Sequence, residues 1–371
     1  MKIAIIGGGI IGLGIGWQLL RNGADVTIYE RGQAGSAAST VAAGMLAPYA
    51  EVGFEELDLM KLGQHSLELY PRFLDELKND TGNVPELDVC GTLLSALDRD
   101  DAQQLRRLFE FRKELDMRIR KISSEEARER EPLLSPRIVS AIWLPDDAQI
   151  DNRALIAALI SAFKNRGGTL IEKTGVVEIT SNNGRIRGVE ANGEPVSYDT
   201  VVLAAGTWSD RIRGLPDRAK PMIRPLKGQI LTLKQTTDCE PACMIRSPDV
   251  YLVPKSDGTI RIGATSEDKG FDTTVTAGAV KDLLEDAWEL VPSIYDLPLQ
   301  EIHAGLRPSG PDHAPSIGYA GVDGLYYAIG HYRHGILYTP VTAYSLTDEI
   351  LHQKPHKRMK TFSPMRFHKR Y

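Results

Sequence analysis

The chain opens with two short apolar runs separated by a longer apolar segment. Lys2 to Ile6 has the length and composition of a buried strand, and Asp25 to Tyr29 is a second run of the same kind. The segment between them, through Trp17 and Leu20, predicts a helix. A strand, a helix and a second strand in this order predict the first β-α-β unit of a parallel sheet.

Further along the chain, the apolar spacing alternates between helical and strand-like periods. Helical spacing predicts helices at 65–80, from about 98 to 131, at 152–168 and at about 276–290, and a closing helix within 336–353. Apolar and polar alternation predicts a strand at 86–97, several short strands between 168 and 206, and long antiparallel strands at 222–235 and within 245–266, where an SDG turn separates two runs and Tyr251 opens the first. Segment 303–318 has the composition of turns, and 324–335 predicts a strand that enters a glycine-bounded turn.

Glycines in the spacing G-x-G-x-x-G connect the first strand to the helix. Gly7, Gly9 and Gly12 carry this spacing, and the second strand ends at an acidic residue, Glu30. In this context the pattern is the dinucleotide-binding fingerprint. Gly7 permits a tight turn, Gly9 lets the backbone approach a pyrophosphate at the helix N-terminus, and Gly12 allows close packing of helix on strand. Glu30 can accept hydrogen bonds from ribose hydroxyls.

The segment after the fingerprint helps to choose between dinucleotides. Residues 31–48, RGQAGSAASTVAAGMLAP, are small, polar and glycine-rich, whereas an NAD enzyme would continue with an ordinary βα unit. A long loop of small residues is suited to wrapping closely around a bulky, flat ligand, which favours FAD. A flexible surface loop is the alternative that composition leaves open.

Composition and charge exclude several other classes of protein. The 371 residues carry a net charge of −5, which gives no global attraction to nucleic acid or membranes. Three cysteines are too few for a disulfide framework and fit a reducing cytoplasm. Outside the N-terminal glycine-containing run, no apolar stretch of about 18 residues predicts a membrane span. The basic tail after residue 353 is interpreted as a solvated terminus rather than an RNA or lipid contact.

The stretch GHYRHG, 330–335, places His331 and His334 on either side of Tyr332 and Arg333. Two histidines three residues apart could suggest a metal site or an acid–base centre. A metal needs further ligands at suitable spacing, and we find none, so we expect no metal here.

Several segments, spread from residue 3 to about 340, together resemble one family of flavoenzymes. They are IAIIGGGIIG…VTIYE, STVAAGML, VVLAAGTWS, RPLKGQ, VYLVPKSDG–IRIGATSED, HAGLRPSGPDHAPSIG and GHYRHGILYTP. The set is similar to the D-amino-acid-oxidase-like family of FAD-dependent oxidoreductases, and within it to the glycine oxidases of bacterial thiamine biosynthesis.

The resemblance implies an α/β fold with a Rossmann-like FAD-binding domain of the GR2 type and an α+β substrate domain with a large antiparallel sheet. The FAD domain is expected to comprise 1–80, 145–215 and 305–371, and the substrate domain 81–144 and 216–304. The resemblance also implies FAD bound without a covalent bond. Relatives with covalent flavin carry a cysteine near the C-terminal part of the active site, and the absence of a cysteine after Cys243 agrees with noncovalent binding. A homo-oligomer, such as a tetramer, is compatible with the family.

The resemblance also assigns roles to particular residues. Arg307 aligns with the arginine that grips the substrate carboxylate, and Tyr251 with the tyrosine that assists it. Arg333 is expected to present its backbone carbonyl to the substrate amine. Met45, Asp249 and Ser266 are expected to line the substrate pocket, and the last two depart from the histidine and methionine of the family pattern. The expected FAD contacts are Gly7, Gly9, Ile10, Ile11, Gly12, Glu30, Arg31, Ser39, Thr40, Ala43, Gly44, Met45, Val176, Val177, Ala205, Gly206, Trp208, Arg307, His331, Tyr332, Arg333, His334, Gly335, Ile336 and Leu337.

The function that the resemblance implies is oxidative deamination of glycine and other small amines or D-amino acids, such as sarcosine, D-alanine and D-proline. Hydride passes to flavin N5, the imine hydrolyses to glyoxylate or an α-keto acid plus ammonia or amine, and O2 yields hydrogen peroxide. The imine is expected to serve thiamine thiazole synthesis. The alternatives are a D-amino-acid dehydrogenase that uses another acceptor, a tRNA-side-chain-modifying FAD enzyme, and a FAD-binding accessory subunit of an amine dehydrogenase.

Overall fold

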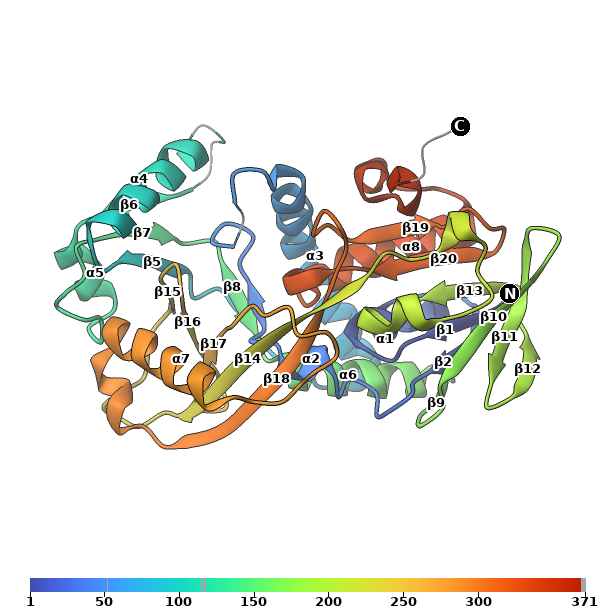
Figure 1. Ribbon diagram of the computed structural model, residues 1–371, viewed down its shortest axis with the longest axis horizontal. Helices are drawn as coiled ribbons and strands as arrows, with labels where there is room; N and C mark the ends of the chain where they lie inside the picture. The colour runs from blue at the N-terminus through green and yellow to red at the C-terminus, as the bar shows by residue number, and fades with distance from the viewer. Residues whose placement is uncertain (52, 114, 116–117, 368–371) are drawn as a thin grey trace.

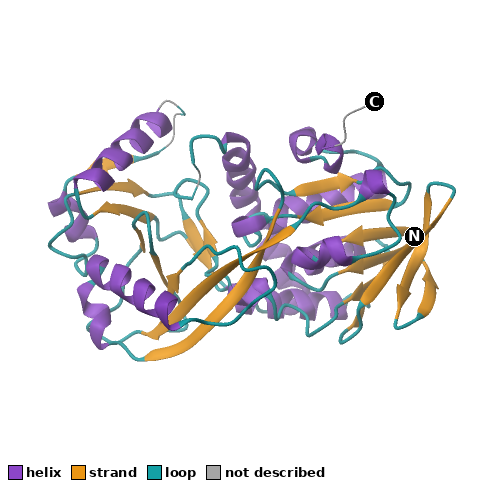
Figure 2. Ribbon diagram, viewed as in Figure 1, coloured by secondary structure: helices purple, strands orange, loops and turns teal. Residues whose placement is uncertain are grey.

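Two large sheets, each with its own set of helices, form the body of the protein (Figure 1). The structure is a computed structural model, and it describes residues 1–51, 53–113, 115 and 118–367. Helices and strands are distributed over both halves, and the N-terminus lies near the six-stranded sheet (Figure 2).

The six-stranded sheet is built on the N-terminal strand and has the order β19-β20-β13-β1-β2-β9. Its members are β1 (Lys2–Ile6), β2 (Asp25–Tyr29), β9 (Thr169–Ile171), β13 (Thr200–Leu203), β19 (Ser316–Tyr319) and β20 (Leu325–Ile329). All neighbours run parallel except β19, which pairs antiparallel with β20 at one edge. The carboxyl ends of β1, β2, β13 and β20 therefore lie at the same edge, where ligands bind in sheets of this class.

Four long helices pack with this sheet through a shared apolar core. They are α1 (Ile10–Arg21), α3 (Leu57–Thr81), α6 (Asn152–Asn165) and α8 (Thr339–His352). Asp151 caps α6 by accepting hydrogen bonds from the backbone N–H groups of Arg153 and Ala154, and Gly82 ends α3 in the left-handed conformation. No helix among the described residues combines the length and apolar character needed to cross a bilayer.

The eight-stranded sheet has the order β18-β14-β17-β16-β15-β5-β7-β6. Its members are β5 (Thr92–Ala96), β6 (Arg120–Ile122), β7 (Ser140–Leu144), β14 (Arg224–Lys234), β15 (Met244–Arg246), β16 (Tyr251–Pro254), β17 (Thr259–Gly263) and β18 (Leu299–Ser309). All neighbours are antiparallel except β15 and β5. Its helices are α4 (Arg99–Lys113), α5 (Ser124–Arg130) and α7 (Ala277–Leu290).

Two small sheets and several short helices complete the chain. The sheets are β10 (Val176–Asn182), β11 (Arg185–Ala191) and β12 (Glu194–Ser197), and β3 (Met45–Leu46), β8 (Ala148–Ile150) and β4 (Leu87–Asp88). The short helices are α2 (Ala38–Val41), η1 (Gly206–Arg211), η2 (Asp217–Ala219), η3 (Pro292–Asp296), η4 (Tyr332–His334), η5 (Lys357–Phe362) and η6 (Pro364–Phe367).

Several predicted elements differ from the observed ones, including the strand expected at 86–97, which is β4 and β5, and the helix expected at 65–80, which begins at Leu57. The single helix expected from 98 to 131 is α4, β6 and α5, because Arg120–Ile122 pairs with β7 at the edge of the large sheet. The segment expected as turns from 303 is the end of β18 up to Ser309. Within 245–266, β16 and β17 lie on either side of the predicted SDG turn, and β15 is an additional short strand before them. The last helix, α8, begins at Thr339 rather than near Gly335, after the short helix η4.

Candidate functional site

A cavity of about 880 Å³ runs from the carboxyl edge of the six-stranded sheet to one face of the eight-stranded sheet. Its size is near the upper end of the range of about 300–1,000 Å³ for small-molecule sites. Gly9 and Ile10 line one part of it, and Tyr251 and Arg307 line another. The cavity therefore joins the fingerprint to the residues expected to bind substrate.

The glycine turn between β1 and α1 brings backbone to the cavity. Gly9 is the N-cap of α1 and supplies no side-chain cap. The Ile10 N–H donates to Ser39 Oγ at 3.1 Å, and the other N–H groups of the first turn have no partner within the helix and can meet a ligand. A Cβ at Gly7 would lie 2.3 Å from the Ala204 carbonyl oxygen, and Gly7 has a φ of +113°. A Cβ at Gly12 would lie 2.0 Å from the Gly7 carbonyl oxygen. Gly7 and Gly12 therefore make close packing possible and do not themselves line the cavity.

Glu30, Arg31 and Trp208 lie together beside this turn, at the rim of the cavity. The Glu30 carboxylate accepts hydrogen bonds from the N–H groups of Gly8 and Gly32, both at 2.8 Å. Each carboxylate oxygen keeps a second lone pair that can accept a ribose hydroxyl. The Arg31 guanidinium carbon lies 3.4 Å from the centre of the Trp208 ring, which is a close cation–π contact.

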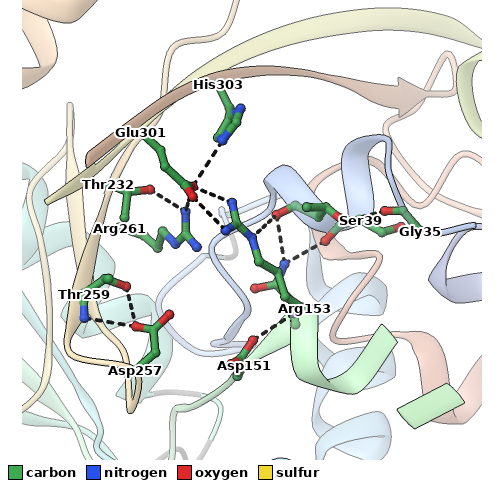
Figure 3. Close-up of polar contacts among 12 residues, drawn as sticks. Gly35, Ser39, Asp151, Arg153, Thr232, Asp257, Thr259, Arg261, Glu301 and His303 are labelled. Carbon is green, nitrogen blue, oxygen red and sulfur yellow. Dashed lines mark hydrogen bonds and ion pairs between the residues drawn. The ribbon is translucent and has the colours of Figure 1, made fainter. Parts of the chain in front are cut away.

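The loop 31–48 is held by a group of charged residues that joins α6 to strands of the eight-stranded sheet (Figure 3). Arg153 forms a two-point ion pair with Glu301, with Nη2–Oε2 and Nη1–Oε1 distances of 2.7 and 3.2 Å. Glu301 also accepts from Arg261 at 3.3 Å. Arg153 Nε donates to the Thr40 carbonyl at 3.4 Å. The loop is thus fixed on its outer side, and its inner side faces the cavity.

Arg307 projects from β18 into the cavity. Its Nη1 donates to the Thr265 carbonyl at 2.9 Å, and no carboxylate among the described residues forms an ion pair with it. A Cβ at Gly228 would lie 2.4 Å from both Arg307 Nη atoms. The guanidinium therefore rests against bare backbone of β14, and its fork is open to an anion.

Tyr251 lies on the same face of the sheet as Arg307. Tyr251 pairs with Gly263 on one side and with Arg246 on the other, and a Cβ at Gly263 would lie 2.5 Å from the Tyr251 hydroxyl oxygen. Burial raises the pKa of Tyr251 above its ordinary value, so its hydroxyl remains a hydrogen-bond donor at neutral pH. Asp249 and Ser266 are exposed residues of the cavity lining.

Both histidines of the turn 330–335 are buried. Burial lowers the pKa of His331 to about 3, and its Nε2 lies 3.1 Å from the Thr342 hydroxyl. Burial also lowers the pKa of His334 below its ordinary value, and His334 Nδ1 lies 3.6 Å from Glu51 Oε2. Both rings are neutral at pH 7. Among the described residues no group of three or more His, Cys, Asp or Glu could hold a metal ion.

The Arg333 guanidinium is held by Glu56 and by the backbone of Glu51. Nη2 donates to Glu56 Oε2 at 2.6 Å and to the Glu51 carbonyl at 2.9 Å. Glu51 itself lines the cavity, its side chain is 9% exposed, and its Oε1 lies 3.5 Å from Arg246 Nη1. Burial alone would raise the pKa of Glu51, but His334, Arg246 and Arg333 outweigh it and hold this pKa at about 2. Glu51 is therefore an anion at neutral pH.

These features fit FAD. The uncapped helix end suits a pyrophosphate, and Glu30 suits a ribose. The Thr207 hydroxyl lines the cavity, is buried, and has no hydrogen-bond partner among the described residues, so a polar ligand group could satisfy it.

The structure brings most of the residues expected at the site to this cavity. Those that line it are Gly9, Ile10, Ile11, Glu30, Arg31, Ser39, Ala43, Gly44, Met45, Val176, Val177, Ala205, Gly206, Trp208, Asp249, Tyr251, Ser266, Arg307, His331, Tyr332, Arg333, Gly335 and Ile336. Five do not line it: Gly7, Gly12, Thr40, His334 and Leu337. The Thr40 hydroxyl donates to the Gly35 carbonyl instead, and His334 and Leu337 are buried in the packing around α8.

Several residues of the cavity lining were not expected from the sequence, and four of them matter for the substrate end: Glu51, Gly228, Arg246 and Gly263. Arg246 could have been found by placing SPDV, 247–250, as the turn of a hairpin, because Arg246 then faces Tyr251. Gly228 and Gly263 had no such signal, since a glycine in a strand only predicts weaker pairing or close approach. Glu51 follows a loop of small residues, and nothing in the sequence marks it as buried.

Comparison with known proteins gives consistent relatives across the whole chain. The family model described as DAO, FAD dependent oxidoreductase, matches residues 2–349. Glycine oxidase from Geobacillus kaustophilus is 33% identical over 351 residues, which are 94% of this chain and 92% of that protein. The crystal structure of glycine oxidase from this organism superimposes with a TM-score of 0.91 at 32% identity, and covers 98% of this chain and 99% of that one.

A longer relative is also similar. The bifunctional protein ThiO/ThiG of Trichormus variabilis is 34% identical over 370 residues, which are 99% of this chain. The chain spans about half of that protein, 55% of its length. With a matched family model over nearly all of its length and a cavity that fits FAD, this chain belongs to the DAO family of FAD-dependent oxidoreductases.

Proposed function

We propose that the chain is an amine oxidase that deaminates glycine and other small amino acids, with sarcosine, D-alanine and D-proline as further candidates. The observation that carries this proposal is Arg307, a cavity-lining arginine with no ion-pair partner among the described residues, next to the partly buried Tyr251. Charged side chains inside a protein are normally paired. An unpaired guanidinium in a cavity therefore points to an anionic ligand, and an amino-acid carboxylate matches its fork.

In this proposal Arg307 and Tyr251 bind the substrate carboxylate from one face of the sheet. Hydrogen bonds to charged groups contribute roughly 1.5–3 kcal/mol each. The Gly228 backbone limits how far the guanidinium can move. This fixed carboxylate orients the α-carbon, and we assign the Arg333 backbone carbonyl to the amine.

FAD, when bound, accepts the hydride of the α-carbon and passes the electrons to O2. Overall, glycine, O2 and water give glyoxylate, ammonia and hydrogen peroxide. The amine must be neutral to lose this hydride, so turnover should rise with pH through the pKa of the bound amine. His331 and His334 are neutral and hydrogen-bonded or packed inside the protein, so we assign neither an acid–base role.

The same proposal covers how FAD is attached, how the chain is divided into domains, and the location, assembly and metabolic role of the protein. We propose noncovalent FAD, since no cysteine lines the cavity, and a division into FAD segments 1–80, 145–215 and 305–371 and substrate segments 81–144 and 216–304. A cytoplasmic homo-oligomer and a role in supplying glycine imine for thiamine thiazole synthesis are further parts of the proposal. The names of the relatives support the last part.

The purified chain with FAD should be tested on glycine, sarcosine, D-alanine and D-proline, with hydrogen peroxide as the readout and no added electron acceptor. The proposal predicts peroxide in proportion to glycine consumed. Substrate-dependent bleaching of the flavin without peroxide would instead favour a dehydrogenase with another acceptor. No bleaching with any of the four substrates would contradict amine oxidation.

A further inference from the structure

The segment 264–276, which connects β17 to α7 and which we name the strap, contacts both ends of the cavity. It begins among cavity-lining residues and then crosses in front of β18 towards the six-stranded sheet (Figure 1). Most of its side chains are exposed, so its position needs specific contacts. Three sets of contacts supply them.

The start of the strap holds Arg307. The Thr265 carbonyl accepts from Arg307 Nη1 at 2.9 Å. Thr265 is itself fixed, because its hydroxyl accepts from the Gln229 N–H at 2.9 Å and donates to Glu267 Oε1 at 2.6 Å. Movement of this part of the strap would remove the carbonyl that orients the guanidinium.

The tip of the strap packs on Trp208. The ring centres of Phe271 and Trp208 are 5.8 Å apart, and Arg211 lies 4.7 Å from the centre of the Phe271 ring. Trp208 lines the cavity beside Arg31 and near Glu30. Phe271 therefore supports, from outside, the wall at the end of the cavity that suits a ribose.

Between these two contacts, the strap is anchored by Lys227. The side chain of Lys227 is 1% exposed, and its Nζ lies 3.2 Å from Asp272 Oδ2 and 4.0 Å from Glu267 Oε2. Nζ also donates to the Thr274 carbonyl. Burial of a lysine is unfavourable unless its charge is paired, and the partners of this ammonium among the described residues all belong to the strap.

The alternation of β14 relates this anchor to the substrate site. Gly228 faces Arg307 on one side of the strand, so Lys227 and Gln229 face the opposite side. Gln229 Nε2 donates to Glu267 Oε1 at 2.8 Å, and its Oε1 accepts from the Thr276 N–H at 2.9 Å. Three successive residues of the motif RPLKGQ therefore have two tasks. Gly228 provides space for the guanidinium, and Lys227 and Gln229 fix the strap.

We propose that Lys227 is a positioning residue that, by fixing the strap, orients Arg307 for the substrate carboxylate and holds Phe271 against the FAD-binding wall at Trp208. The part that concerns substrate rests on the proposed function. The part that concerns FAD affinity does not depend on it.

Two variants separate the contacts of the strap. Lys227→Met removes the anchor, so the strap moves and the Thr265 carbonyl no longer orients the Arg307 guanidinium. Loss of this charged hydrogen bond should raise KM for glycine by about tenfold and leave kcat within about threefold. We also expect a higher Kd for FAD in reconstitution of the apoprotein.

Phe271→Ala should raise the FAD Kd by about three- to tenfold, the range of one aromatic pair, and leave KM within twofold. Trp288→Ala, an exposed aromatic of α7, is the control and should change neither quantity.

The outcomes are distinct. If folded Lys227→Met retains the KM and FAD Kd of the wild type, the positioning role is wrong. If only its FAD Kd changes, the link to Arg307 is wrong, and if Phe271→Ala leaves the FAD Kd unchanged, the contact at Trp208 has no such role. Should Lys227→Met not fold, Asp272→Asn weakens the same anchor from the exposed side and must give the same pattern. If the wild type fails to oxidise glycine, the proposed function fails, and the FAD measurements still test the strap.

Discussion

At the scale of single residues, the proposed substrate site depends on two absent side chains. Gly228 leaves room for the Arg307 guanidinium, and Gly263 leaves room for the Tyr251 ring. Both glycines have strand neighbours and neither has a positive φ. Their role is therefore space rather than backbone freedom, and it exists only because β14, β16, β17 and β18 are adjacent in the sheet.

Gly228→Ala should impair glycine binding. The added methyl group would lie 2.4 Å from the Arg307 Nη atoms, so the guanidinium must move from its place beside Tyr251. We expect KM for glycine to rise by about tenfold or more, as for loss of a charged hydrogen bond, while the flavin absorbance spectrum stays the same. Gly278→Ala in α7, where a Cβ meets nothing within 4 Å, is the control. An unchanged KM in Gly228→Ala would show that this guanidinium position is not used.

His334→Ala should affect stability more than turnover. His334 is 2% exposed and packs against the Tyr338 ring at 5.1 Å, outside the cavity lining. We expect a loss of roughly 1–3 kcal/mol in the free energy of unfolding, with kcat/KM for glycine within a few-fold of wild type. Complete loss of turnover in a folded, FAD-containing variant would contradict the absence of an acid–base role.

At the scale of elements, the local sequence pattern correctly predicted helices and strands that contact near neighbours along the chain. The unit β1-α1-β2 and its glycines could be predicted because strand, turn, helix and acid follow one another within 30 residues. The charged segment 98–131 was predicted wrongly as one helix, because β6 is a strand only through its edge pairing with β7. Similarly, the turn-like composition of 303–309 is overridden by antiparallel pairing of β18 with β14. Tertiary pairing outweighs local preference in both cases.

For the site as well, local sequence pattern predicts only part of the structure, and the loop 31–48 is an example. Its small residues indicated a close approach to a flat ligand, and most of its predicted contacts line the cavity. The Arg153–Glu301 ion pair behind it joins residues 148 positions apart, so no local pattern could reveal it. The orientation of Thr40, whose hydroxyl turns to Gly35, follows from this packing.

At the scale of the whole molecule, family resemblance supplied what local pattern could not. The order of the motifs predicted two sheets of different type, and the comparison with solved relatives confirms the fold. The buried charges were not predicted. Lys227 and Asp147 are buried because of contacts between distant segments, whereas the residue type alone predicts an exposed side chain for both.

Asp147 should make global stability depend on pH. The residue is fully buried, its Oδ1 accepts from the Tyr49 N–H at 3.1 Å, and burial raises its pKa to about 7. The unfolded chain titrates this group near 3.8. Between these values the folded state binds the proton more firmly, so the free energy of unfolding falls as pH rises from about 4 to 7.

Asp147→Asn removes this titration and keeps an acceptor for Tyr49. Relative to the variant, the wild type should lose on the order of 4 kcal/mol of unfolding free energy between pH 4 and pH 8. Denaturant unfolding of the FAD-bound proteins at several pH values measures this difference. Parallel pH profiles for the two proteins would show that Asp147 is ionised in the folded state over the whole range.

The central claim, that Arg307 binds the substrate carboxylate in an FAD-dependent amine oxidase, is tested most directly by steady-state kinetics of Arg307→Ala with glycine and peroxide detection. The variant should bind FAD with an unchanged absorbance spectrum and lose about 10- to 150-fold or more in kcat/KM, the range of a charged hydrogen bond. A decrease of less than about threefold, with FAD bound, would contradict the claim.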